Sequence, residues 1–231
     1  MSEARDLRTR LSAVLAPRTA GAAGITAAVG VCSVATAFTA SPGVGVFASL
    51  ALTALVAWAR GSWLGLERPA SWARAIALGA GAGVAIQVAT VLGLEPLVEG
   101  LTGRAPDVSQ FDGIRGDLAA LLQWLAIVWV VVVFVEEWVF RGLLARELCA
   151  LLGDGRGALA AGLAASSLVF GLAHAYQGIG GVISTGVVGL VLAALTARER
   201  WNLWPAVIAH GTIDTIGLWA IYANVDRALA Q

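Results

Sequence analysis

Long apolar runs separated by short polar connections repeat along nearly the whole chain. Each run approaches or exceeds the roughly 20 apolar residues that a helix needs to cross a bilayer. The predicted membrane-spanning segments are residues 19–40, 44–60, 72–94, 118–150, 157–175, 180–197 and 203–223. The runs are apolar throughout and lack the strict alternation of barrel strands. The pattern therefore predicts an all-α, polytopic transmembrane helix bundle of about seven spans.

The composition supports lipid as the main solvent of the chain. Hydrophobic residues make up 58% of the 231 positions, charged residues make up 13%, and the mean hydropathy is +0.81. Soluble domains carry about 25% charged residues, so the chain has too few polar side chains to cover a water-soluble surface. Its net charge of zero gives no global field that would recruit nucleic acid. We expect the lipid bilayer, and no nucleic acid, as a partner.

The positions of the arginines predict the orientation of the bundle. All 15 basic residues are Arg, and most fall in the N-terminal segment and in residues 60–74, 141–156 and 198–200. Because arginine-rich short connections stay on the cytoplasmic side, the N-terminus is predicted to be cytoplasmic. The longest polar segment, Glu95 to Asp117, is then expected to be an external loop or lid.

The first chemical signal interrupts the apolar segment 118–150. Its first 18 residues carry no charge, and Glu136, Glu137 and Arg141 then follow. On a helix, residues four apart share a face, so Glu137 and Arg141 can pair. Glu136 points about 100° away and has no local partner. We expect Arg141 to neutralise Glu137, Glu136 to face a cavity as a free carboxylate, and these charges to lie in the cytoplasmic half of the membrane.

The second signal is the position of the only two histidines, His174 and His210, in two further apolar segments. Asp214 lies four residues after His210 and shares its helical face. Ionisable groups inside a membrane are costly, so they face the bundle interior and usually have a function. A Glu and a His can activate a water molecule. A second His and a protonated Asp can stabilise an oxyanion, so a hydrolytic site is predicted where these groups meet.

These clusters resemble the motifs of the CPBP family (CAAX protease and bacteriocin-processing, also called Abi) of intramembrane proteases. The three motifs read here Glu136-Glu137-x-x-x-Arg141, Phe170-x-x-x-His174 and His210-x-x-x-Asp214, each on a separate predicted span. The resemblance covers about residues 118–223. It implies two units: N-terminal transmembrane helices with an external loop over residues 1–117, and a catalytic helix bundle over residues 118–231.

The resemblance implies an intramembrane endopeptidase that hydrolyses a peptide bond of a membrane-associated peptide or protein. In the family, the first Glu and the first His activate the attacking water, which corresponds here to Glu136 and His174. The second His and the last motif position stabilise the tetrahedral intermediate, which corresponds to His210 and Asp214. We expect a multi-pass protein of the plasma membrane of a prokaryote, with a hydrated cavity that opens toward the cytoplasm.

The supporting positions of the family correspond to Glu137 and Arg141. Asp214 stands where the prenyl-protein endopeptidases of eukaryotic type have Asn, which argues against prenylated substrates. Glu136, His174 and His210 could ligate a divalent metal such as zinc and leave one position open. A metal-free mechanism, in which the glutamate activates the water, is equally compatible with these residues.

Two other functions remain open at this stage. The same polar cluster could serve only a structural purpose in a non-enzymatic membrane interaction or bacteriocin-immunity protein. A transporter or proton relay is disfavoured, because the N-terminal spans lack the ionisable residues that such a pathway needs.

Overall fold

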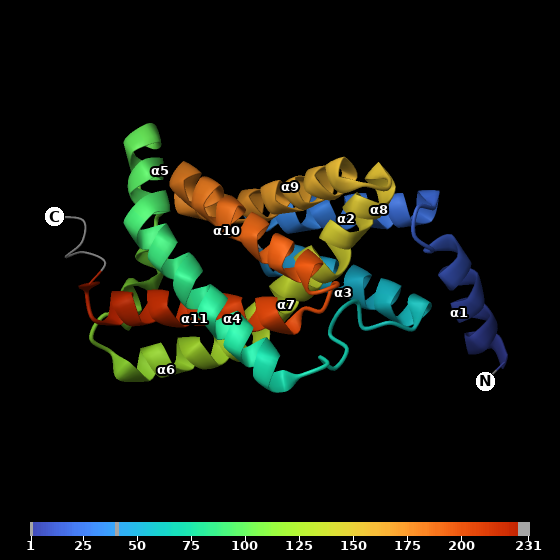
Figure 1. Ribbon diagram of the computed structural model, residues 1–231, viewed down its shortest axis with the longest axis horizontal. Helices are drawn as coiled ribbons and strands as arrows, with labels where there is room; N and C mark the ends of the chain where they lie inside the picture. Colours follow the sequence, from blue (N-terminus) through green and yellow to red (C-terminus); the bar gives the residue numbers. More distant parts are fainter. Residues whose placement is uncertain (1, 40–41, 226–231) are drawn as a thin grey trace.

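The computed structural model describes residues 2–39 and 42–225, and every regular element within these residues is a helix (Figure 1). The N-terminal helices are α1 (Ser2–Val14), α2 (Ala20–Ala35), α3 (Pro42–Arg60), α4 (Trp72–Ala89), η1 (Thr90–Leu94), α5 (Glu95–Thr102) and η2 (Ser109–Ile114). The C-terminal helices are α6 (Leu118–Ile127), η3 (Val128–Val132), α7 (Val133–Glu136), η4 (Glu137–Ala145), α8 (Arg146–Leu152), α9 (Arg156–Ala173), η5 (Ala175–Gln177), α10 (Gly178–Arg198) and α11 (Trp204–Tyr222). The all-α prediction is confirmed for these residues.

Each predicted span corresponds to a helical stretch, and five stretches are long and apolar enough to cross a membrane. These five are Gly43–Arg60, Trp72–Thr102, Leu118–Leu152, Arg156–Ala173 and Ala175–Arg198. The protein is therefore an integral membrane protein. Of the other two predicted spans, α2 is apolar but has 16 residues, and α11 is not among the five. Residues 40–41, at the end of the first predicted span, and residues 226–231, at the end of the predicted catalytic unit, lie outside the described residues.

The prediction of a loop from Glu95 to Asp117 is wrong in its first part. The helix that begins at Trp72 continues through the π-helical turn η1 and ends as α5 at Thr102. Pro96 does not stop it, because this residue lies in the first turn of the new α-helical segment, where the missing N–H is tolerated. The true connection to α6 therefore starts at Gly103, a residue with a φ of 70°.

The helical stretch from Leu118 to Leu152 contains two π-helical segments, η3 and η4. Such segments are rare and frequently occur at functional sites. Glu136 ends α7 and Glu137 begins η4, so the glutamate pair lies at a junction between two helix types. This junction is near the middle of the 35-residue stretch, and the charged residues of the stretch all lie in its second half. The side of the membrane on which they lie stays a prediction.

Small residues in α4 let α11 approach closely. A Cβ atom at Gly83 would lie 2.6 Å from the carbonyl oxygen of Ala209, and one at Gly79 would lie 2.7 Å from that of Pro205. Gly81 faces open space, so of these three glycines only Gly79 and Gly83 serve helix packing. The close approach places α4, which precedes the predicted catalytic unit, against the helix that carries His210 (Figure 1).

Four connections meet at one end of the bundle, which we call the arginine-rich end: residues 15–19, 61–71, 153–155 and 199–203. Arg18 pairs with Asp154, and the backbone N–H of Leu203 donates to the carbonyl of Gly65 at 2.8 Å. The predicted arginine-bearing connections are thus neighbours in space, as a common side of the membrane requires.

The remaining connections, residues 36–39, 103–117, 174–177 and 223–225, lie at the opposite end. The backbone N–H of Asp107 donates to the carbonyl of Gln177 at 2.9 Å. The backbone N–H of Gly116 donates to the carbonyl of Tyr222 at 3.1 Å.

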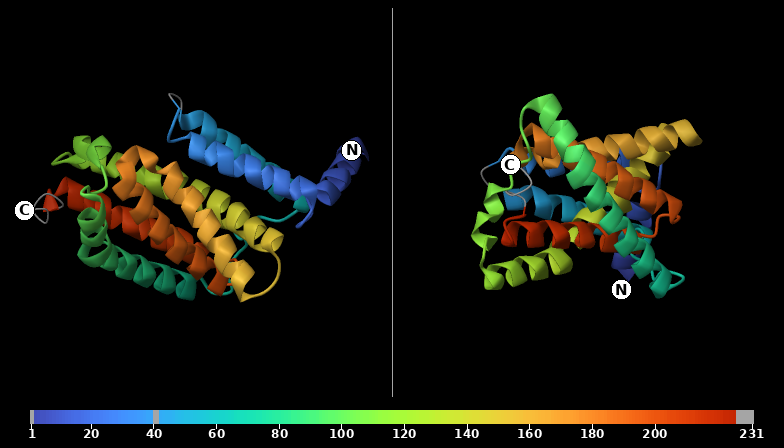
Figure 2. Two further views of the ribbon diagram at one scale, coloured as in Figure 1. Left: turned by 90° about the horizontal axis from the view of Figure 1, so that it is seen from above. Right: turned by 60° about the vertical axis from the view of Figure 1, so that its left-hand side comes forward.

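The hairpin of α2 and α3 forms an outer layer that packs on η4, α8 and α9 (Figure 2). Helices from both sides of the predicted boundary at residues 117 and 118 therefore pack against one another. The division into two units stays a prediction.

Candidate active site

Glu137 and Arg141 form the buried centre of the site. The Arg141 Nη1 atom lies 3.0 Å from the Glu137 Oε1 atom, and the two side chains are 1% and 0% exposed. The guanidinium group also donates from Nη2 to the carbonyl of Gly189 at 3.3 Å and lies 4.2 Å from the centroid of the Phe170 ring. The absence of a side chain at Gly189 allows this packing of the guanidinium group and the Phe170 ring, because a Cβ atom at position 189 would lie 2.7 Å from the ring. The pair predicted from the spacing of four residues is present.

Glu137 also orients His210. The His210 Nδ1 atom lies 2.8 Å from the Glu137 Oε1 atom. Because a carboxylate accepts, Nδ1 carries the proton and donates it to this hydrogen bond. The other ring nitrogen, Nε2, then points toward Glu136 Oε2 at 3.7 Å and Asp214 Oδ2 at 3.6 Å. Arg141, Glu137 and His210 thus form a chain that holds one imidazole nitrogen beside two further carboxyl groups.

Glu136 is the exposed member of the glutamate pair. Its side chain is 24% exposed, whereas that of Glu137 is fully buried. Glu136 lines a cavity within the bundle, as predicted for a carboxylate whose neighbour takes the arginine.

His174 lines the same cavity from a different direction. It caps the C-terminal end of α9, and its Nδ1 atom lies 2.8 Å from the carbonyl oxygen of Phe170. A carbonyl can only accept, so Nδ1 donates and a neutral ring keeps its lone pair on Nε2. The ring packs edge-on against that of Phe170 at 4.6 Å. No hydrogen bond or ion pair joins His174 to a carboxyl group of the described residues.

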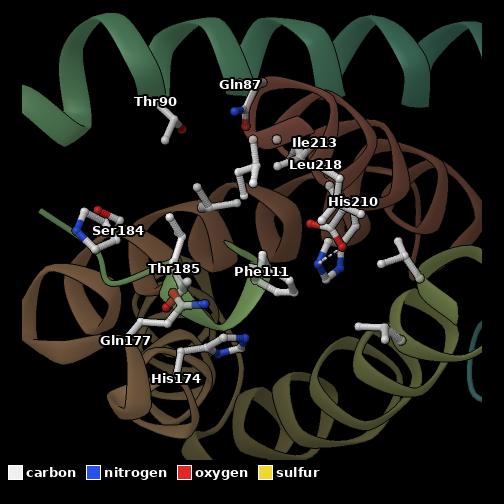
Figure 3. Close-up of a pocket in the computed structure, with 18 of the residues that line it drawn as sticks. Gln87, Thr90, Phe111, His174, Gln177, Ser184, Thr185, His210, Ile213 and Leu218 are labelled. Carbon is white, nitrogen blue, oxygen red and sulfur yellow. Dashed lines mark ion pairs between the residues drawn. The ribbon is translucent and has the colours of Figure 1, made fainter. Parts of the chain in front are cut away.

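The cavity has a volume of about 470 Å³ and lies among α4, η1, α5, α7, α9, α10 and α11. Glu136, His174, His210 and Asp214 all line it. Figure 3 shows His174 on the side opposite Gln87 and Thr90, with His210 at a third position on the wall. The structure therefore brings four of the six predicted residues to one cavity, with Glu137 and Arg141 buried behind His210.

The cavity extends to the connections at the end opposite the arginine-rich end. Pro106, Val108, Gln110 and Phe111 line it, and these residues belong to the connection at the opposite end. None of the described residues of the arginine-rich end lines it. The orientation of the bundle in the membrane and the side to which the cavity opens both stay predictions.

A second cavity of about 500 Å³ lies between the tip of the α2–α3 hairpin and α7. It is lined largely by apolar side chains, and it shares Glu136, His174 and Tyr176 with the first cavity. The two residues predicted to activate water thus stand between two cavities.

Some wall residues could not be identified from the sequence. Glu95, Thr90 and Gln87 line the cavity from the helix that precedes the predicted catalytic unit. Tyr176 lines it two residues after His174. A carboxylate directly after an apolar run was the available signal for Glu95, but the same signal is typical of any residue at a membrane surface.

The arrangement does not fit the expected metal ligands. In the described part of the chain, no three side chains of His, Cys, Asp or Glu form a group that could hold a metal ion. Ligands of zinc all lie about 2.0–2.3 Å from one ion. Glu136, His174 and His210 do not form such a set in the structure. Metal binding stays a prediction, and no step derived below passes through a metal.

The structure is thus a membrane-embedded helical bundle that gathers two histidines and several carboxyl groups around an internal cavity. Comparison with protein families gives a match for the part of the chain that carries these residues. Residues 118–216 match the family described as "Type II CAAX prenyl endopeptidase Rce1-like". This segment is therefore similar to that family, and it contains all six predicted site residues. No curated protein and no solved structure matches the chain.

Proposed function

We propose that the protein is an intramembrane endopeptidase, similar to the CAAX proteases, that hydrolyses a peptide bond of a membrane-associated peptide or protein. The observation that carries this proposal is the shared cavity. Glu136, His174, His210 and Asp214 come from three helices and line one space inside the bundle. The family that residues 118–216 match is described as one of endopeptidases, which supports the same reaction.

The attacking water binds between Glu136 and His174. The carboxylate of Glu136 has no hydrogen bond within the described residues, so it is free to accept a proton from this water. The lone pair on His174 Nε2 accepts the second hydrogen bond and orients the oxygen. As the proton moves to Glu136, the water oxygen forms a bond to the carbonyl carbon of the peptide.

The developing oxyanion is stabilised on the other side by His210 and Asp214. In its protonated form, Asp214 donates a hydrogen bond, and His210 donates from Nε2 when its ring carries both protons. Glu137, held by Arg141, accepts from Nδ1 and favours the charged ring through its own negative charge. The C–N bond then breaks, and Glu136 gives its proton to the leaving amine. The products are a carboxylic acid and an amine, and the site returns to its starting state.

The test compares Glu136→Gln and His174→Ala with the wild-type protein on a library of fluorescently quenched apolar peptides in detergent micelles. Both changes are expected to reduce cleavage by about a hundredfold or more, because general acid–base groups typically contribute this much. Helix content by circular dichroism should stay the same. Glu99→Gln is the matched control, because Glu99 is exposed and lies outside the cavity.

Cleavage by the Glu136→Gln protein at the wild-type rate would overturn the mechanism. Retention of the cellular phenotype in a Glu136→Gln strain would favour the alternative, a membrane interaction or immunity protein with a structural polar cluster. Treatment with a strong zinc chelator distinguishes the two mechanisms: equal activity would support the metal-free one, and a loss of activity that zinc restores would support a metal site.

A further inference from the structure

The cavity has a polar wall that the proposed mechanism does not use. It forms where the α4–η1–α5 helix faces α10, and its polar residues are Gln87, Thr90, Glu95, Ser184 and Thr185. Gln87, Thr90 and Glu95 precede the segment that matches the family. Figure 3 shows Gln87 and Thr90 on the same helix, across the cavity from His174.

The π-helical turn η1 is what turns Glu95 toward the cavity. The backbone N–H of Glu95 donates to the carbonyl of Thr90, five residues earlier. In a regular α-helix, residues five apart point about 140° away from each other. The wider π turn brings them onto one face, so both Thr90 and Glu95 line the cavity.

Polar groups on this wall lack partners inside the protein. The Glu95 side chain is partly buried and has no hydrogen bond or ion pair with a described residue. Ser184 is 6% exposed, and its Oγ atom is buried without a hydrogen-bond partner. Unpaired buried polar groups cost free energy, which a bound ligand with matching groups would recover.

The charges of the wall define what such a ligand carries. The ionisable side chains that line the cavity are those of Glu95, Glu136 and Asp214 and two histidines, and the mechanism above leaves Glu95 and Glu136 as its carboxylates. No Arg is among the lining residues that the structure describes. A cationic group is therefore attracted into the cavity, and the low dielectric of the bundle strengthens its attraction to a carboxylate.

We propose that Glu95, with Thr90 and Ser184, forms a specificity subsite that takes a basic side chain, Lys or Arg, of the peptide substrate. The carboxylate pairs with the cation, and the two hydroxyl groups hydrogen-bond to the peptide beside it. This inference rests on the proposed endopeptidase function. It concerns which peptides are cut and leaves the bond-breaking step to Glu136 and His174.

The test uses fluorescently labelled apolar host peptides that carry Lys, norleucine or Glu at each position in turn. The wild-type protein should prefer one Lys peptide over its norleucine counterpart by about tenfold to a hundredfold in kcat/KM, as expected for a hydrogen bond to a charged group. Glu95→Gln should reduce this ratio to about one, Glu95→Asp should retain part of it, and Glu95→Lys should invert it toward the Glu peptide. Glu99→Gln, on the same helix but exposed, should keep the wild-type ratio.

Binding of the same peptides to the Glu136→Gln protein, measured by fluorescence anisotropy, separates the two proposals. If Lys peptides bind preferentially and Glu95→Gln removes the preference, the subsite stands even where the wild-type protein cleaves none of them, and only the protease proposal fails. Cleavage or binding that ignores the charge of the peptide overturns the subsite and leaves the protease proposal intact. If no peptide is bound or cleaved, both are overturned.

Discussion

At the scale of single residues, the site depends on Glu137, which shares one oxygen between two basic groups. Its Oε1 atom lies 3.0 Å from Arg141 and 2.8 Å from His210. The sequence spacing predicted the contact to Arg141, because four residues along a helix define a shared face. It could not predict the contact to His210, because that contact bridges 73 positions and depends on how α11 packs.

We predict that Glu137→Gln lowers both stability and the activity of the folded protein. Removing one partner of a buried ion pair typically costs about 3–5 kcal/mol, because the remaining charge stays buried without compensation. The neutral amide would also no longer favour a charged His210. Unfolding in detergent gives the first quantity, and the cleavage rate per folded molecule gives the second.

Glu147→Gln is the matched control. Glu147 is 1% exposed and pairs with Arg60 through two hydrogen bonds, of which one is 2.9 Å long, but it lies outside the cavity. It should destabilise the protein to a similar extent and leave the rate per folded molecule near the wild-type value. An equal loss of rate in both variants would mean that Glu137 acts only through stability.

At the scale of helices, the close contact between α4 and α11 sets the position of His210. Gly83 faces Ala209, the residue directly before His210. A larger side chain at position 83 must push α11 away, and overpacking of this kind typically costs about 1–3 kcal/mol. We predict that Gly83→Leu destabilises the protein and reduces cleavage, as measured by thermal unfolding and the peptide assay.

Gly81→Leu provides the comparison, because a side chain at this position meets open space. It should change neither measurement by much. If both variants behave alike, the effect would come from the helix propensity of glycine and not from the α4–α11 contact.

The helices were more predictable than their ends and distortions. Apolar runs located α4, α6, α7, α9, α10 and α11, because the membrane requires long apolar segments, but α5 and η2 fell in the predicted loop. The continuation through Pro96 was not predictable, since it depends on the π-helical turn before it. Amphipathic α1 was also missed, because a short helix with Arg5, Arg8 and Arg10 has no membrane-length apolar run. The motifs identified the predicted site residues. The cavity wall that contains Glu95 could not be predicted, because it depends on how helices distant in the sequence pack.

At the scale of the whole molecule, hydrogen bonds and ion pairs of carboxylate groups stabilise the connections at the arginine-rich end. Burial alone would raise the pKa of Glu67, but hydrogen bonds from backbone N–H groups and the Ser62 hydroxyl outweigh it, and the pKa is lowered. The hydrogen bond from Arg74 lowers the pKa of Glu199, and the hydrogen bond from Arg18 lowers that of Asp154. The contacts of Glu67 lie within the connection after α3. The other two contacts join the start of α4 to residues 199–203 and residues 15–19 to residues 153–155.

We predict that acid weakens this end of the molecule. Because the pKa values are lower in the folded state, the stabilisation is complete above the ordinary carboxyl pKa and is lost as the pH falls through the lowered values. Thermal unfolding in detergent should therefore occur at lower temperature at about pH 3 than at about pH 6. The double variant Glu67→Gln/Glu199→Gln should show a smaller difference, and an unchanged difference would contradict this assignment.

The π-helical segment that begins at Glu137 has a consequence for how sequences of this kind can change length. Each residue of a helix turns the following side chains by about 100°. An insertion or deletion within Glu137–Ala145 would rotate Arg141 or α8 relative to the glutamates, even if every reactive group were retained. A change in the length of the connection over residues 103–117 would not rotate the predicted site residues relative to one another in this way. The number of residues in the long helix therefore determines the arrangement of the candidate site, just as the identity of its side chains does.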